Sequence, residues 1–196
     1  MFKFKNDERG FSLLEMLVSV VVLLLIMAGV ASLLIHNARI NKAQQMTAEI
    51  QSSARNSLEL IVQVLRSAGW DPGNQGINIV GLDPNLGDNV SQIEVFIDLD
   101  GDGLTDQDDE QILIRHNNGQ IEWRRNATGA FAVLSNNISN DADGDGTLEP
   151  MFVPDDTVNP TMITVQITAQ SRDPDPTSRD FIRYTVRSDV VLRKEL

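Results

Sequence analysis

The sequence predicts an α+β fold in which one long N-terminal helix packs against an antiparallel β-sheet. The first 70 residues contain no proline, and after position 35 their apolar residues recur every three or four positions. The remainder alternates apolar and polar residues over short segments separated by Gly, Asn, Asp and Pro, which is typical of antiparallel strands with one buried face. The 196 residues therefore suit one anchored stalk and one domain of roughly 125 residues.

The first half of the expected helix is apolar enough to cross a membrane. Residues 11–35 carry a single charge, Glu15. At about 1.5 Å per residue this run spans roughly 37 Å, more than the about 30 Å of a bilayer core. The preceding leader, residues 1–10, holds three basic residues, whereas no Lys or Arg occurs in the apolar run. This asymmetry predicts a cytoplasmic N-terminus.

The second half of the helix, residues 36–70, is amphipathic and is expected to continue into a globular domain at 71–196. Gly69 and Asp71-Pro72 are typical of a helix end. The apolar positions expected to face the sheet are Ile40, Ala43, Met46, Ala48, Ile50, Leu58, Ile61, Val62 and Leu65.

Short alternating segments predict the strands. Residues 73–89 are rich in Gly, Asn, Asp and Pro and are expected to form a loop. Asn118-Gly119 predicts a tight hairpin turn, and the assignment of the apolar patch at 131–134 is open. The expected strands are 93–97, 111–115, 120–124, 162–169 and 181–192.

The charge of the chain excludes some classes of partner. Its formal net charge is −12, and between positions 71 and 159 there are 18 acidic residues against three arginines. Nucleic-acid binding needs the opposite sign, so no nucleic-acid partner is expected. The chain has no cysteine, so no disulfide can stabilise the domain. Cations are the alternative means of holding acidic segments together.

Glu15 requires an explanation, because a carboxylate in an apolar membrane helix is costly and usually paired or functional. One interpretation is that its side chain extends to the cytoplasmic headgroups. The other is that a cut after Gly10 gives Phe11 a free amine, which pairs with Glu15 of a neighbouring copy. Two desolvated opposite charges attract strongly only in register, so this pair would set the stagger between packed helices.

The segment from Arg9 to Glu15 and the apolar run after it resemble the class III prepilin signal of type IV pilins and type II secretion pseudopilins. The shared features are a basic leader, Gly10 before the cut, Phe11 as the first mature residue and Glu15 as the fifth. The resemblance implies cleavage between Gly10 and Phe11 by prepilin peptidase, N-methylation of Phe11, and an assembly role for Glu15. An ordinary secretory signal would place its small residues after the apolar segment.

A second segment, ARNSLELIVQVLRSAGWDPG at 54–73, resembles the helix end of PilW-type minor pilins, and J-type pseudopilins share the layout more loosely. The resemblance implies a single-pass inner-membrane protein with a periplasmic domain that moves to the pilus tip. Its implied partners are prepilin peptidase and other minor and major pilins, in a tip complex that primes pilus assembly. The alternatives are a J-type pseudopilin of a type II secretion system and a calcium-dependent adhesion module on an uncleaved signal anchor.

Residues 98–109 fit the spacing of a calcium loop, which places oxygen ligands at positions 1, 3, 5, 7, 9 and 12 and a glycine at position 6. Gly103 is at position 6. The expected ligands are Asp98, Asp100, Asp102, the carbonyl of Leu104, Asp106 and Asp109. The loop resembles those of dockerins and thrombospondin type 3 repeats. The alternative is a solvated acidic turn.

Residues 141–149 begin with the same pattern and predict a second, weaker calcium loop. Position 12 falls on Phe152, which cannot ligate, so Asp155 or Asp156 would have to reach back. The alternative is a turn rich in Asp and Asn. The expected ligands are Asp141, Asp143, Asp145, Thr147 and Glu149.

Nothing in the sequence predicts an enzyme. His36 and His116 match no metal or triad motif, and no serine lies in a Gly-x-Ser-x-Gly segment. There is also no glycine-rich phosphate loop. A structural protein is therefore expected.

Overall fold

The computed structural model describes residues 12–72, 80–82, 91–105, 110–126, 128–156 and 160–192. These ranges contain one helix and eight strands. They are α1 (Leu13–Ser67), β1 (Val80–Leu82), β2 (Gln92–Phe96), β3 (Gln111–Asn117), β4 (Gln120–Arg125), β5 (Ala132–Asn136), β6 (Phe152–Pro154), β7 (Met162–Gln170) and β8 (Arg183–Val191).

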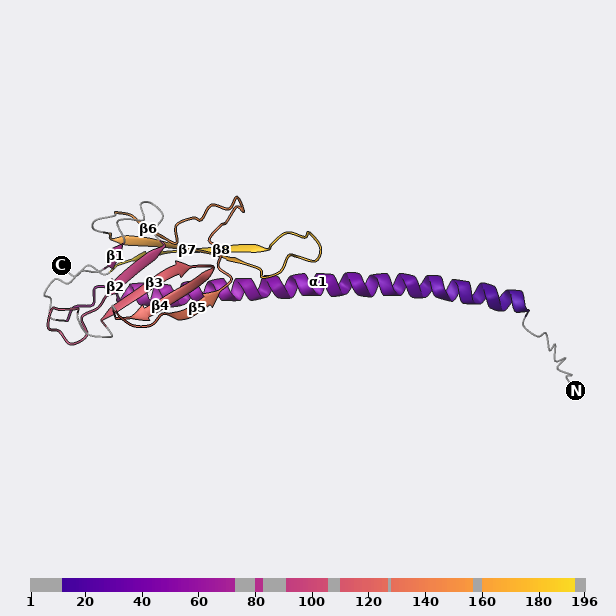
Figure 1. Cartoon of the computed structure of the whole chain (residues 1–196), viewed down its shortest axis with the longest axis horizontal. Helices are drawn as coiled ribbons and strands as arrows, with labels where there is room; N and C mark the ends of the chain where they lie inside the picture. The colour runs from indigo at the N-terminus through magenta and orange to yellow at the C-terminus, as the bar shows by residue number, and fades with distance from the viewer. Residues whose placement is uncertain are drawn as a thin grey trace, which may run out of the picture.

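Helix α1 is a rod whose N-terminal half projects away from a β-rich domain gathered around its C-terminal half (Figure 1). Its 55 residues correspond to a length of about 80 Å. Every residue from Ser12 to Lys42 is exposed, and the first buried residue is Ile50. The α+β architecture and the single long helix predicted from the sequence are confirmed.

One stripe of α1 is buried in the domain. Its members are spaced three or four residues apart, as one face of a helix requires, and they are Ile50, Ala54, Ser57, Ile61 and Leu65. Leu58 and Val62 pack at the edge of this stripe. Ile40 and Ala48 are expected from their spacing to face the sheet, but both are exposed.

The strands form two antiparallel sheets, where the sequence suggests a single one. The five-stranded sheet has the order β1-β2-β3-β4-β5, and the three-stranded sheet has the order β6-β7-β8. The break falls in the connection at 137–151, which carries the second acidic loop. Within this connection Ile138 forms a single bridge to Ala169 of β7.

The core lies between α1 and the two sheets. The largest fully buried apolar side chains are Phe152, Ile61, Leu65, Ile93, Ile114, Ile121, Ile138, Met151, Ile163 and Ile167. Strand β7 is buried on both faces. Its apolar residues join this core, whereas Thr164 bonds Asp189 at 2.6 Å and Thr168 bonds Thr185 at 2.9 Å. Side-chain hydrogen bonds therefore join β7 to β8 on the face of the sheet that is turned away from the apolar core.

Two local predictions are confirmed by backbone geometry. Asn118 and Gly119 have φ values of 47° and 77°, and they connect β3 to β4 as a two-residue turn. Gly69, just after α1, has a φ of 71°, a conformation that glycine adopts without strain. Its N–H donates to the carbonyl of Phe96 at 3.0 Å. The end of α1 is thereby tied to β2, where the first acidic loop begins.

Candidate functional site

The exposed half of α1 is the first candidate site. Among the described residues α1 is the one helix long and apolar enough to cross a membrane, and its most apolar window has no buried residue. Leu13 is 88% exposed and Leu25 is 69% exposed. An apolar surface of this extent marks a region that a membrane or another protein covers.

Glu15 lies in the first turn of α1, where a negative charge is stabilised by the helix dipole. Ser12 is the N-cap, and its hydroxyl accepts a hydrogen bond from the Leu14 N–H at 3.3 Å. Ser12 and Glu15 occupy the N-cap and N3 positions of a capping box. The Ser-x-x-Glu motif is present in the sequence, but we did not use it to predict the start of the helix. Gly10 and Phe11, the expected processing residues, lie outside the described residues.

The first acidic loop follows β2 and gathers three carboxylates. Asp98, Asp100 and Asp102 each offer an oxygen within 4.8 Å of the others. Asp98 is fully buried, and its two oxygens accept hydrogen bonds from the N–H groups of Gly101 at 2.6 Å and Gly103 at 3.1 Å. Both glycines have positive φ, near 80°. The chain therefore wraps around Asp98 and turns the other two carboxylates toward it.

Glu110 closes the first loop. Its carboxylate accepts from the Leu99 N–H at 2.9 Å, and its carbonyl accepts from the Ile97 N–H at 2.8 Å. The sequence places the closing ligand at Asp109, which lies with Asp106 outside the described residues. Glu110 stands one position later and is 1% exposed. Glu110 could have been noticed in the sequence because it directly precedes a predicted strand. The start of that strand places its side chain inside the domain.

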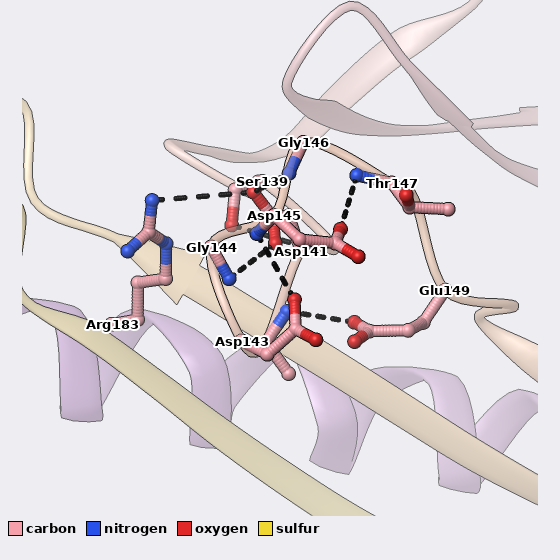
Figure 2. Close-up of polar contacts among 10 residues, drawn as sticks. Ser139, Asp141, Asp143, Gly144, Asp145, Gly146, Thr147, Glu149 and Arg183 are labelled. Atoms are coloured by element: carbon pink, nitrogen blue, oxygen red, sulfur yellow. Dashed lines mark hydrogen bonds and ion pairs between the residues drawn. The ribbon is translucent and has the colours of Figure 1, made fainter.

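The second acidic loop lies between β5 and β6 (Figure 2). Its hydrogen bonds repeat those of the first loop almost one for one. Asp141 accepts from Gly144 at 2.6 Å and from Gly146 at 3.3 Å. Asp143 and Asp145 complete a second group of carboxylates within 4.8 Å of one another. The shared pattern is therefore a property of the Asp-x-Asp-Gly-Asp-Gly sequence, whichever sheet flanks it.

Position 7 is also equivalent in the two loops. The N–H of Leu104 donates to Asp102 at 2.7 Å, and the N–H of Thr147 donates to Asp145 at 2.6 Å. Each bond fixes the last carboxylate of its group.

Glu149 takes in the second loop the place that Glu110 takes in the first, since its carboxylate accepts from the Ala142 N–H at 2.7 Å. Asn140 joins the two ends of the loop. Its carbonyl accepts from the Glu149 N–H at 2.7 Å, and its side-chain amide donates to the Glu149 carbonyl at 2.9 Å. The Asn140 amide oxygen also accepts from the Thr168 N–H at 3.2 Å, so the loop is anchored on β7. Asn140 was not predicted from the sequence.

Asp155 belongs to another part of the domain. Its carboxylate accepts hydrogen bonds from the hydroxyl and N–H of Thr161 and from the N–H of Met162. These bonds lower its pKa to about 2, the Thr161 hydroxyl contributing most. Asp155 therefore links the ends of β6 and β7.

The electrostatics of the two loops differ. The Asp102 N–H lowers the pKa of Asp100, but desolvation and the negative charges of Asp102, Glu110 and Asp98 outweigh that bond and raise the pKa overall. In the second loop, hydrogen bonds from the Thr147 N–H and hydroxyl lower the pKa of Asp145. Arg183 also lies near this loop, with Nη2 4.0 Å from Oδ2 of Asp141. The first loop thus holds crowded carboxylates whose repulsion a cation would relieve.

The donor chemistry of both groups fits a hard divalent cation. Three carboxylates converge in each, and no histidine belongs to either group. Oxygen ligands of this kind suit calcium, which accepts flexible geometry and completes its shell with carbonyls and water. Among the described histidines, His116 instead bonds the Ile138 carbonyl at 3.1 Å.

Comparison with known proteins finds one match, in the N-terminal segment. The family model for the prokaryotic N-terminal methylation motif matches residues 5–31. No curated protein and no solved structure matches the chain. The motif suggests a structural protein rather than an enzyme. Together with the apolar half of α1, it supports membrane anchoring and a type IV pilin-like protein, either a pilin or a pseudopilin.

Proposed function

We propose that this chain is a minor pilin of a type IV pilus, processed by prepilin peptidase and incorporated into a tip complex that primes pilus assembly. The observation that carries the proposal is the exposed apolar half of α1 with one carboxylate in its first turn. A membrane would cover this half before assembly, and the helices of other pilins would cover it afterwards. The methylation motif at residues 5–31 supports the same assignment.

Glu15 would set the register of that packing. Cleavage after Gly10 would place the new amine of Phe11 next to the N-cap Ser12, at the same end of the helix as Glu15. The carboxylate of one subunit could then pair with the amine of its neighbour. In a low-dielectric helix bundle such a pair is favourable only when both groups meet, so it would select one axial stagger.

The topology follows from the charge of the leader. Three basic residues precede the apolar run, which favours a cytoplasmic N-terminus in the inner membrane and a periplasmic β-domain.

Sheared pili provide the test of the proposed function. We expect the chain in the pilus fraction at few copies per filament, and its deletion should reduce the number of pili. Normal piliation without the chain would contradict the priming role.

Two alternatives predict different results. A J-type pseudopilin would use the same helix in a type II secretion system, and its gene would lie among secretion genes with deletion impairing secretion. A calcium-dependent adhesion module on an uncleaved anchor would keep Met1 in the mature protein.

We further propose that the first acidic loop binds calcium through Asp98, Asp100 and Asp102, with Glu110 holding the loop closed. Asp106 and Asp109 would supply further oxygens, as their spacing predicts. The second loop would bind through Asp141, Asp143 and Asp145. In the absence of disulfides, calcium bound only by the folded domain would stabilise it by mass action.

Melting of the full-length protein in detergent, with calcium and with a chelator, tests this. At a free calcium concentration 100 times the dissociation constant, the gain in the free energy of unfolding is about 2.7 kcal/mol. Magnesium at the same concentration is the control for ionic strength. An equal melting temperature in calcium and in chelator would contradict a structural metal.

A further inference from the structure

Glu15 has a definite angular position on α1, because α1 is one uninterrupted helix from Leu13 to Ser67. At about 3.6 residues per turn, the helix makes about 11 full turns from Glu15 to Arg55 and about 40° more. The same spacing places Ser53 about 160° from Glu15. Glu15 therefore lies on the side of α1 that carries Arg55 and faces away from the side that carries Ser53.

Arg55 and Ser53 contact different edge strands of the β-domain. The guanidinium of Arg55 donates to the hydroxyl of Tyr184 at 3.1 Å, and Tyr184 belongs to β8. The hydroxyl of Ser53 is hydrogen-bonded to that of Ser135 at 2.9 Å, and Ser135 belongs to β5. Strands β8 and β5 thus flank α1 on different sides, and the side of β8 is the side of Glu15.

The side of β8 is an open surface of the domain. Strand β8 is an end strand of its three-stranded sheet. One edge of β8 therefore has no strand partner among the described residues, and proteins usually cover such an edge or protect it with charged side chains. By the same helical spacing, Glu59 and Arg66 lie about 80° and about 60° from Glu15. The exposed charged residues on this side, which we call the β8 flank, are Arg55, Glu59, Arg66, Arg187 and Asp189.

The β8 flank is net positive, with three arginines against two acidic residues, in a chain whose formal net charge is −12. Residues 71–159, by contrast, hold 18 acidic residues against three arginines. A surface that complements the flank is therefore acidic. Charge complementarity of this kind favours encounter of the right partner and fixes its orientation.

The register set by Glu15 also fixes the height of the neighbouring subunit. Pairing of Glu15 with the amine of a neighbour's Phe11 offsets the two helices by four residues, or about 6 Å. The buried stripe of α1 from Ile50 to Leu65 is longer, about 22 Å. A neighbouring pilin with a helix of similar length therefore carries its β-domain at nearly the same height, on the Glu15 side.

We propose that the β8 flank is the lateral docking surface for an acidic β-domain of the neighbouring pilin, the one whose N-terminal amine pairs with Glu15. This inference rests on the proposed function, in which pilin helices pack around the apolar half of α1. The exposed apolar half of α1 and the β8 flank would then form one continuous interface along the Glu15 side of the molecule. The β5 side, where Ser53 meets Ser135, would not face that neighbour.

Site-directed cross-linking tests which side faces the neighbour. The chain contains no cysteine, so a single introduced cysteine can be labelled without background. The full-length chain in cells that assemble pili carries Arg187→Cys on the flank, or Asn136→Cys at an exposed position of β5 as the matched control. Each variant is labelled with a benzophenone maleimide in isolated membranes and sheared pili and then irradiated. We expect Arg187→Cys to give an adduct whose second component mass spectrometry identifies as a different pilin, and Asn136→Cys to give none.

Arg187→Glu tests the charge of the flank. We expect its incorporation into sheared pili to fall about fivefold, because attraction to an acidic partner becomes repulsion. Arg125→Glu, at an exposed position of β4 in the other sheet, should incorporate at the wild-type level. Melting of both proteins checks that the domain stays folded, and Arg187→Gln, with a smaller loss, replaces Arg187→Glu if that variant does not fold. Wild-type incorporation of the Arg187 variant would overturn the assignment of an acidic partner.

The outcomes separate this inference from the proposed function. If the chain retains Met1 or is absent from pili, the proposed function is wrong and this inference with it. If the chain begins at Phe11 and enters pili, but the adduct forms from Asn136→Cys, equally from both positions or from neither, the β8 flank is the wrong surface. An adduct of Arg187→Cys with a second copy of this chain, or with a protein that has no prepilin signal, would likewise overturn it.

Discussion

The carboxylate of Glu149 accepts the N–H of Ala142 at 2.7 Å and thereby closes the second acidic loop. Glu110 makes the equivalent bond to Leu99 at 2.9 Å in the first loop. The closing glutamate stands at position 9 of one loop and at position 13 of the other. The same carboxylate cluster thus occurs twice, with different numbers of residues between the cluster and its closing glutamate.

Glu110→Gln tests whether the closing glutamate supports metal binding. The substitution keeps the shape of a side chain that is 1% exposed and removes its charge. We expect the calcium affinity of the first loop to fall about 10- to 100-fold, as for other groups that orient ligands. Glu59→Gln on the exposed face of α1 removes the same charge as a control. Unchanged calcium titration in Glu110→Gln would contradict the assignment.

Two adjacent positions on α1 test the packing of the helix. Ile61 is fully buried, whereas Leu60 is 46% exposed. Ile61→Ala should lower the free energy of unfolding of the β-domain by about 2–5 kcal/mol. Leu60→Ala should change it by no more than about 0.5 kcal/mol. Denaturant unfolding in detergent measures both, and equal losses would mean that the helix faces are assigned wrongly.

Asp155 makes the stability of the domain depend on acid. Its pKa is lowered to about 2 from an ordinary value of 3.8, chiefly by the Thr161 hydroxyl and the Met162 N–H. A lowered pKa in the folded state stabilises the protein above pH 3.8, and this contribution is lost as the pH falls toward 2.

The comparison uses melting of the wild type and Asp155→Asn between pH 5 and pH 2, in chelator. The difference in melting temperature between the two proteins should shrink as the pH falls. Exposed Asp180→Asn is the control. A constant difference across the range would exclude Asp155 as the cause.

Glu15→Gln separates the charge of Glu15 from its place in the helix cap. A capping box accepts glutamine in place of glutamate at N3, the third residue of the helix, so the helix start is preserved while the charge is lost. We expect normal expression and cleavage but poor incorporation into filaments. Ser12→Ala weakens the cap and keeps the charge, and it should incorporate better than Glu15→Gln. Incorporation of Glu15→Gln at the wild-type level would remove the register argument.

The sequence was most informative where a local pattern decides local structure. The spacing of apolar residues predicted the buried stripe of α1 at Ile61 and Leu65, and Asn118-Gly119 predicted the hairpin turn. The start of each acidic loop could also be predicted, because glycines at positions 4 and 6 permit the positive φ values that wrap the chain around the first aspartate.

The pairing of strands that lie far apart in the sequence could not be predicted from local patterns. Strands β1 and β6 have three residues each, too few to show a period, and their place depends on their partners β2 and β7. The connection between the two sheets is attached to β7 through Asn140 and Ile138, and these contacts join residues about 30 positions apart in the sequence. The position of Arg183 beside Asp141 depends on the register of β8, which no pattern in its own segment reveals.

The state of the N-terminus tests the central proposal most directly. Mass spectrometry of the chain, isolated from membranes of cells with active prepilin peptidase, distinguishes the mature form from the precursor. The pilin assignment predicts a protein that begins at Phe11 and carries one methyl group on its amine. A protein that retains Met1 would contradict it and would favour a membrane-anchored module that never enters a filament.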